Sequence, residues 1–224
     1  MKQRIRLSRG ISLAVTALIA AGALAVSGPA GVSVTGTVTS VAGDASVGES
    51  PAELSSQVSE GGSIVTGPDA SCSVLVDRRS LLQFCGQAAV RLRHDAQRNA
   101  TILDVMEGST RALVGPRPAD EPLEIHTPVA IAAILGTILS VTVDPVTGDS
   151  TFALEEGSAK IQTRDPALGR TINLRAGEQV TIHADGRIGE VQPFDLKDVV
   201  GKTGCLDDSF FHVASVEIAR QERY

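Results

Sequence analysis

Apolar and polar residues alternate along most of this chain, and turn-forming residues separate the alternating runs. In one run, Leu139, Val141 and Val143 alternate with Ser140 and Thr142. A period of two is typical of a strand that faces a core on one side, and Gly, Pro, Asn and Asp between runs are typical of turns. The pattern predicts an all-β domain of many short strands. The expected strands are residues 32–41, 63–66, 71–76, 81–84, 88–93, 101–106, 109–114, 137–143, 151–154, 159–163, 171–174 and 179–183.

Residues 127–137 do not follow the alternating pattern. Thr127-Pro128 and Gly136-Thr137 bracket seven consecutive apolar residues. Thr127 as an N-cap and Pro128 at the first helical position favour a short helix. A run that is apolar on both faces is also typical of a fully buried strand. The pattern alone leaves both interpretations open.

Two stretches of the chain are similar to each other. Residues 101–114 and residues 150–163 each contain a strand, a Glu-Gly-Ser step and a second strand, and a cation, Arg111 or Lys160, occupies the same place in both. Each such unit needs neighbours to cover its apolar face. The expected architecture is therefore a solenoid-like or sandwich-like stack of short strands.

The N-terminus has the features of a secretory signal. Four cations within the first nine residues precede an apolar stretch at residues 11–26, and Ala23-Leu24-Ala25 supplies small residues at a cleavage site. We expect cleavage after Ala25 and a periplasmic or secreted mature chain. The alternative is a retained membrane anchor, although the apolar stretch is shorter than the roughly 20 residues of a full span. Only an uncleaved segment would touch a membrane.

The net charge of the chain excludes some classes of binding partner. The whole chain carries a net charge of −6, and removal of residues 1–25 would take away four positive charges, giving −6 − 4 = −10. An acidic exported chain is repelled by phosphate backbones and by anionic membrane surfaces. We therefore expect no nucleic-acid partner.

The chain contains three cysteines, Cys72, Cys85 and Cys205. A turn at residues 77–80 between two apolar runs would place Cys72 opposite Cys85, within reach of a disulfide. The export signal points to an oxidising compartment, where such a bond persists. The alternative is a pair of buried, reduced thiols. Cys205 is then left over, either unused or available for a bond between chains.

No constellation of residues in the sequence indicates catalysis, a metal or a cofactor. The four histidines, His94, His126, His183 and His212, are scattered and lack the spacing of a zinc site. The loop at residues 144–149 lacks the alternating acids of a calcium loop. Glu155-Glu156 is better explained as the end of a strand than as a catalytic acid pair. We expect no catalytic, metal-binding or cofactor-binding residue and no enzymatic activity.

Most of the mature chain, roughly residues 32–191, resembles the FecR domain family. The resemblance rests on an ordered set of motifs: Thr-Pro, a small apolar run, Gly-Thr, an alternating strand, a strand that ends in Glu-Gly, and Leu-x-x-Gly-Glu. The matching residues are Thr127, Pro128, Gly136, Thr137, Glu156, Gly157, Leu174, Gly177 and Glu178. Residues 61–84 are similar to the first strand and hairpin of the family. We expect residues 1–25 to form the signal peptide, 32–191 the FecR-like β domain and 192–224 a C-terminal appendage.

The resemblance implies an all-β domain in which the Thr-Pro to Gly-Thr segment is extended and buried. Well-known members of the family are membrane-spanning regulators that pass a signal from an outer-membrane receptor to a cytoplasmic sigma factor. Ten residues precede the hydrophobic segment here, and about thirty follow Val191. We therefore expect a stand-alone exported module rather than a complete relay.

The functional expectation is a noncatalytic periplasmic interaction module with a regulatory or envelope-associated role, acting by contact with a protein partner in the cell envelope. The alternative is a module that binds envelope glycan such as peptidoglycan. Sugar binding usually recruits Trp or Tyr, and the chain has no Trp and one Tyr. In the appendage, Asp207-Asp208-Ser209 can start a helix. That segment either caps an open edge of the β domain or binds a partner, with Cys205 as a link.

Overall fold

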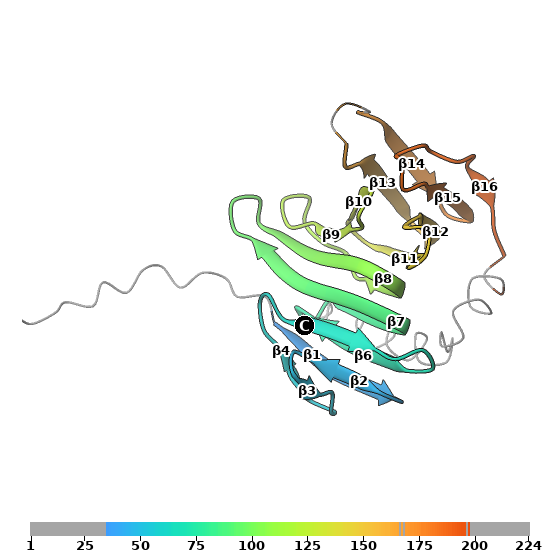
Figure 1. Ribbon diagram of the computed structural model, residues 1–224. Helices are drawn as coiled ribbons and strands as arrows, with labels where there is room; N and C mark the ends of the chain where they lie inside the picture. Colours follow the sequence, from blue (N-terminus) through green and yellow to red (C-terminus); the bar gives the residue numbers. More distant parts are fainter. Residues whose placement is uncertain (1–34, 166, 168, 196, 198–224) are drawn as a thin grey trace, which may run out of the picture. The chain divides into compact units, whose positions relative to one another are not determined.

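The computed structural model describes residues 35–165, 167, 169–195 and 197, which fold into β-strands joined by turns (Figure 1). The strands are β1 (Gly36–Ala42), β2 (Ala45–Val47), β3 (Ser50–Pro51), β4 (Gln57–Val58), β5 (Ser63–Thr66), β6 (Ser71–Val76), β7 (Ser80–Asp95), β8 (Ala100–Val114), β9 (Leu123–His126), β10 (Ala130–Ile134), β11 (Thr137–Val143), β12 (Ser150–Glu156), β13 (Ser158–Thr163), β14 (Thr171–Arg175), β15 (Glu178–Ile182) and β16 (Gln192–Pro193). The expected all-β fold class is confirmed.

Hydrogen bonds join the sixteen strands into one sheet that does not close. The long strands β7 and β8 divide this sheet, because their two halves have different neighbours. The first sheet has the order β4-β1-β6-β7-β8-β11-β12-β15-β16, and the second has the order β3-β2-β5-β7-β8-β9-β10-β13-β14. All neighbours are antiparallel except β8 and β9.

The two sheets pack face to face around one hydrophobic core. The core includes Val74, Phe84 and Leu139 of the first sheet and Leu92 and Ile125 of the second. Gly36 lies between the layers, since a Cβ atom at this position would be 2.6 Å from Val74 and 3.6 Å from Leu92. The stack is therefore sandwich-like.

Glycines with left-handed backbones mark the points where the chain passes between the sheets. Gly108, at φ +81°, lies where β8 leaves the second sheet for the first, and Gly157, at φ +85°, lies between β12 of the first sheet and β13 of the second. A Cβ atom at Gly108 would be 2.4 Å from the backbone of Ala88, so no larger residue fits there. The two similar Glu-Gly-Ser steps in the sequence are thus two crossings between layers.

Most expected strands are present, with informative differences. Residues 81–84 and 88–93 are parts of one strand, β7, because a bulge between Cys85 and Ala89 bends the strand without ending it. Residues 101–106 and 109–114 are likewise parts of β8. Strand β9 was not among the expected strands, since its alternation covers only four residues.

The helical interpretation of residues 127–137 is wrong, because this segment is a turn followed by strand β10. The Thr127 hydroxyl accepts hydrogen bonds from the backbone N–H groups of Val129, at 3.4 Å, and Ala130, at 3.1 Å. These are the bonds that an N-cap residue makes, but here they close a turn between β9 and β10. In β10, Ala130, Ala132 and Ile134 are buried and the residues between them are partly exposed, so the strand is buried mainly on one face.

The expected disulfide between Cys72 and Cys85 is wrong. The turn between β6 and β7 is one residue shorter than expected, and Cys72 therefore lies opposite Phe84. A shift of one residue moves a side chain to the other face of a sheet. Cys72 is a free, buried thiol, so it is not the disulfide partner of Cys85.

Two expectations fall on parts of the chain that are not described. The signal segment lies within residues 1–34, and most of the C-terminal appendage lies within residues 198–224. Among the described residues, no helix has the length and apolar character needed to cross a membrane.

Candidate functional site

Three neighbouring strands of the second sheet place charged side chains on its outer face. In β9, Leu123 and Ile125 belong to the core, so Glu124 and His126 between them point outward. Asp104 of β8 lies directly opposite His126. The same alternation places Arg91 and Arg93 of β7 on this face, because Val90 and Leu92 belong to the core.

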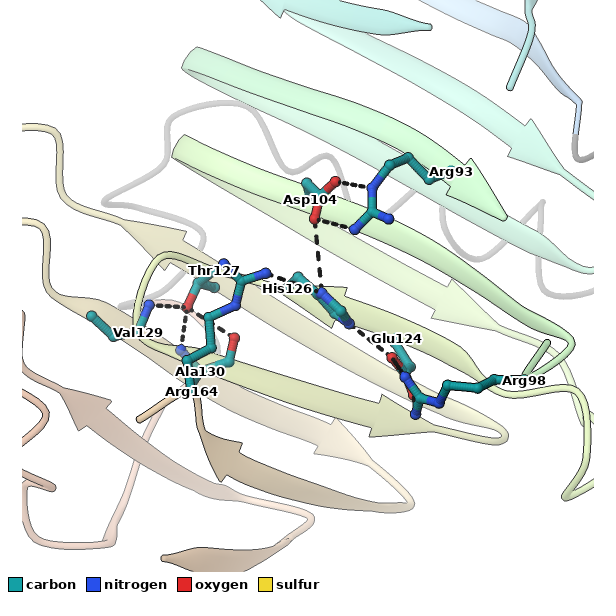
Figure 2. A network of polar contacts seen from close by, with 9 residues as sticks. All are labelled: Arg93, Arg98, Asp104, Glu124, His126, Thr127, Val129, Ala130 and Arg164. Carbon is teal, nitrogen blue, oxygen red and sulfur yellow. Dashed lines mark hydrogen bonds and ion pairs between the residues drawn. The ribbon is translucent and has the colours of Figure 1, made fainter. Parts of the chain in front are cut away.

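His126 is at the centre of the resulting polar network (Figure 2). Its Nε2 atom lies 2.8 Å from Glu124 Oε2, and its Nδ1 atom lies 3.3 Å from Nη2 of Arg164. Because an arginine only donates, the contact with Arg164 makes Nδ1 the acceptor and leaves Nε2 to donate to Glu124. The Glu124 and His126 side chains are only 3% and 8% exposed.

Each carboxylate of the network is also held by an arginine. Arg93 makes a two-pronged contact with Asp104, with Nη2 2.9 Å from Oδ1. Arg98 binds both carboxylate oxygens of Glu124. Burial by itself raises the pKa of Asp104, but the hydrogen bond and charge of Arg93, together with His126 and Arg164, bring that pKa below its ordinary value. Asp104 is therefore a stable anion at neutral pH.

Two hollows lie beside the network and share Arg164. One has a volume of about 330 Å³ and is lined in part by Arg91, Met106 and Pro128; the other, of about 410 Å³, is lined in part by Lys160. Among the described residues, no carboxylate oxygen lies within 4 Å of the charged groups of Arg91, Lys160 or Arg164. Apart from the contact of Arg164 with His126 Nδ1, the described residues leave these cations available to an anionic partner.

The face is locally positive on an acidic chain. Five cations, namely Arg91, Arg93, Arg98, Lys160 and Arg164, stand against the carboxylates of Asp104, Glu124 and Asp95, a surplus of 5 − 3 = 2 positive charges. The complete chain has a net charge of −6. An arginine is well suited to bind a carboxylate in a two-pronged manner. The site is thus arranged to recognise carboxylates.

Two hydroxyls border the hollows beside the network. That of Thr127 is engaged by the turn before β10, and that of Thr163 lines the second hollow. Within the described part of the chain, no group of three or more His, Cys, Asp or Glu side chains could hold a metal ion. Recognition by charge and hydrogen bonding is the chemistry that these residues can perform.

The residues of the sequence motif fall into three places in the structure. Thr127 and Pro128 border the first hollow. Gly136, Thr137 and Gly157 meet where β10 passes to β11, and a Cβ atom on Gly157 would lie 2.8 Å from the Gly136 carbonyl oxygen.

The remaining motif residues lie at strand ends. Glu156 is exposed at the end of β12. Gly177 has a φ of +83° in the turn before β15, and the Glu178 carboxylate closes that turn by accepting a hydrogen bond from the Arg175 N–H at 2.9 Å. Apart from Thr127 and Pro128, the motif therefore shapes turns away from the polar network.

The sequence indicated this site only weakly. His126 was one of four scattered histidines, and Glu124 belonged to no motif. The usable signal was the alternation of Leu123-Glu124-Ile125-His126, which places the two polar side chains on one face. The partners Arg93, Asp104 and Arg164 come from other strands, so only the pairing of those strands brings them together.

Taken together, the described residues form an open two-layer β-sandwich with a charged outer face on one sheet. Residues 62–160 match the model of the family described as FecR protein. This confirms the resemblance found in the sequence motifs, and the matched segment is a FecR-family domain.

The fold also occurs in solved structures. A crystal structure at 1.65 Å of a candidate anti-sigma factor from Parabacteroides distasonis ATCC 8503 has a TM-score of 0.53, with 15% identity over 62% of this chain and 63% of that chain. A second crystal structure of such a protein from this organism, at 2.50 Å, has the same TM-score and identity, over 62% of each chain. The chain thus spans less than two thirds of these neighbours. No curated protein matches the chain.

Proposed function

We propose that this protein is a noncatalytic regulatory module of the FecR type that acts in the cell envelope by contact with a protein partner. The observation that carries the proposal is the FecR-family domain at residues 62–160. The structural neighbours described as candidate anti-sigma factors support a regulatory role. At the N-terminus, four cations are followed by an apolar stretch, which supports export to the periplasm or beyond the cell.

The contact surface is the outer face of the second sheet around His126. Arg91, Arg164 and Lys160 border the two hollows and are not neutralised by described carboxylates. Arg93 pairs with Asp104 and Arg98 pairs with Glu124, and these ion pairs hold the four side chains in place on this face. A protein segment rich in Asp and Glu complements this surface, because carboxylates can pair with the unengaged cations.

Crosslinking in intact producing cells tests the proposal. A photoreactive amino acid in place of Gln162, an exposed residue that lines the second hollow, should join the chain to a protein of the envelope. The same amino acid in place of Val146, at a remote hairpin tip and 91% exposed, should give no such product. Crosslinks from both positions to the same set of abundant proteins would overturn the assigned surface.

Charge reversal tests whether the cations beside the two hollows bind the partner. Arg91→Glu with Arg164→Glu should weaken capture of the crosslinked partner by about 10-fold or more, since removing close charge pairs costs several kcal/mol. Arg78→Glu with Arg187→Glu makes the same change in net charge at exposed turns elsewhere and should leave capture unchanged. Retention of the wild-type protein by isolated peptidoglycan, with no protein partner, would contradict the proposal.

A further inference from the structure

The His126 ring is enclosed by charged groups from three of the segments around it (Figure 2). From its own strand, Glu124 Oε2 lies 2.8 Å from Nε2. From β8, Asp104 Oδ1 lies 3.8 Å from Nδ1. From the residue that follows β13, Arg164 Nη2 lies 3.3 Å from the same Nδ1 atom. The remaining neighbour, β10, places the uncharged Ile131 opposite His126.

Three further arginines surround these partners. Arg93 and Arg98 bind the two carboxylates, and Arg91 of β7 lines the same hollow as the ring. Arginines keep their charge at every pH at which proteins are folded. A histidine, by contrast, ordinarily changes its charge between pH 5 and pH 8. His126 is therefore the residue of the network whose charge responds to a moderate change of pH.

The contact between Nδ1 and Arg164 depends on the protonation state of the ring. Because the guanidinium only donates, Nδ1 accepts this hydrogen bond through its lone pair. A proton on Nδ1 occupies that lone pair, and the ring and the guanidinium then repel each other as like charges. Asp104 Oδ1 is the acceptor on this side of the ring for the new N–H group. Protonation thus exchanges Arg164 for Asp104 as the partner of Nδ1.

The Arg164 side chain is placed to move when this bond is lost. Its backbone is held, because the Arg164 N–H donates to the Val129 carbonyl oxygen at 2.9 Å, but the residue is exposed. Among the residues that the structure describes, no carboxylate oxygen lies within 4 Å of its charged atoms. Arg164 also lines both hollows. A guanidinium released by the ring is therefore available to a ligand in either hollow.

We propose that His126 is a positioning residue whose protonation releases Arg164 and strengthens the binding of an acidic protein segment to this face. The inference rests on the proposed function, which supplies the acidic segment as the ligand. Protonation also raises the positive surplus of the face to 2 + 1 = 3 charges. The carboxylates of the ligand stay ionised at pH 6, because Asp and Glu ordinarily titrate near pH 4. The affinity therefore rises as the pH falls from 8 to 6, and by linkage the bound acidic segment favours the protonated ring.

NMR spectroscopy of the folded, isotope-labelled full chain tests the release of Arg164 without any ligand. At pH 8, the ¹⁵N shifts of His126 should show an unprotonated Nδ1 and a protonated Nε2. As the pH falls to 6, the guanidinium signals of Arg164 should change with the same midpoint as the ring signals. In His126→Gln, whose amide can still donate to Glu124, the Arg164 signals should stay constant. Arg164 signals in the wild type that do not follow the ring would overturn the proposal.

Binding of a pentaglutamate peptide at pH 8 and pH 6, at one ionic strength, tests the effect on the ligand. The wild type should bind about 5-fold more tightly or better at pH 6, within the usual range of coupling between two sites. His126→Gln should bind equally at both pH values. His183→Gln is the matched control, because His183 also contacts a carboxylate, that of Asp149 at 2.8 Å, but lines neither hollow. It should keep the pH effect.

The two ways in which this binding experiment can fail have different meanings. Equal wild-type affinity at pH 8 and pH 6 would contradict the role of His126 and leave the acidic partner of the proposed function in place. Absence of peptide binding at both pH values would contradict the acidic partner itself, and with it the regulation inferred from His126.

Discussion

Arg111 of β8 and Glu155 of β12 form a two-pronged ion pair, although 44 positions separate them in the chain. The Nε–Oε1 distance is 2.9 Å and the Nη2–Oε2 distance is 2.6 Å, and the side chains are 4% and 8% exposed. Ser140 of β11 lies between the two strands and donates to Glu155 Oε1 at 3.0 Å. The pair links three adjacent strands on the outer face of the first sheet.

Replacing one partner of this ion pair should destabilise the fold strongly. Glu155→Gln leaves the buried Arg111 guanidinium without its matching carboxylate, which costs about 3–5 kcal/mol when a buried pair is broken. Urea unfolding measures the change. Glu156→Gln, at the exposed neighbouring position, should change the free energy of unfolding by less than about 0.5 kcal/mol. Equal losses of unfolding free energy from the two substitutions would show that the ion pair stabilises the fold no more than the exposed Glu156 carboxylate does.

Gly157 should not tolerate a side chain. Gly157→Ala forces a left-handed alanine, at about 1–2 kcal/mol, and its Cβ atom would lie 2.8 Å from the Gly136 carbonyl oxygen, which adds about 1–3 kcal/mol of overpacking. Gly48 has a similar φ of +60°, but a Cβ atom there would meet no atom within 4 Å. Gly48→Ala should therefore lose only the free energy of the left-handed backbone. The two unfolding midpoints, compared directly, separate these contributions.

The Thr127 hydroxyl should stabilise the turn before β10. Thr127→Val keeps the shape of the side chain but leaves the N–H groups of Val129 and Ala130 without their acceptor, and should cost about 1 kcal/mol, as loss of an N-cap does. Thr127→Ser keeps the hydroxyl and should retain most of the stability. A fully stable Thr127→Val protein would contradict the role assigned to this motif residue. Thermal unfolding of the three proteins provides the comparison.

Asp104 should make stability depend on acidic pH. Its pKa in the folded protein is lowered from 3.8, so its contribution is complete above that value and is lost as the pH falls through the lower folded pKa. At pH 7, Asp104→Asn should cost about 1 kcal/mol, since Arg93 is 39% exposed and partly screened by solvent. The difference from wild type should shrink below about pH 4.

A matched acid makes this pH prediction specific. Asp120 is exposed and has no hydrogen bond or ion pair with another described residue. Asp120→Asn should therefore follow the wild-type stability curve between pH 7 and pH 3. A difference between wild type and Asp104→Asn that stays constant over this range would contradict the lowered pKa.

The Cys72 thiol should be inert in the folded protein. Burial raises its pKa to about 11, so the thiolate, which is the reactive form, is scarce at pH 8, and the side chain is 1% exposed. Iodoacetamide should modify Cys72 only after unfolding. Rapid labelling of the native protein would show that the β6 edge of the core opens frequently.

The sequence by itself determined the strand-rich fold and the family. Alternation with period two gave β5, β6 and β11 with their observed bounds, because each places alternate apolar residues in the core and has flanking turn residues. The motif residues Gly136, Gly157 and Gly177 carried the resemblance, and they now stand at turns and close contacts. Such local features depend on neighbouring residues and can be recognised in a single chain.

The tertiary structure decided the features that depend on which strands pair. Thr127-Pro128 has the local chemistry of a helix start, but pairing with β9 and β13 makes the following residues a strand. One residue fewer in the β6–β7 turn moved Cys72 and Cys85 to opposite faces and excluded the expected disulfide. His126 meets Asp104 and Arg164 only because β8, β9 and the end of β13 are brought together. Strand pairing and its register, which the apolar–polar pattern did not reveal, set all three outcomes.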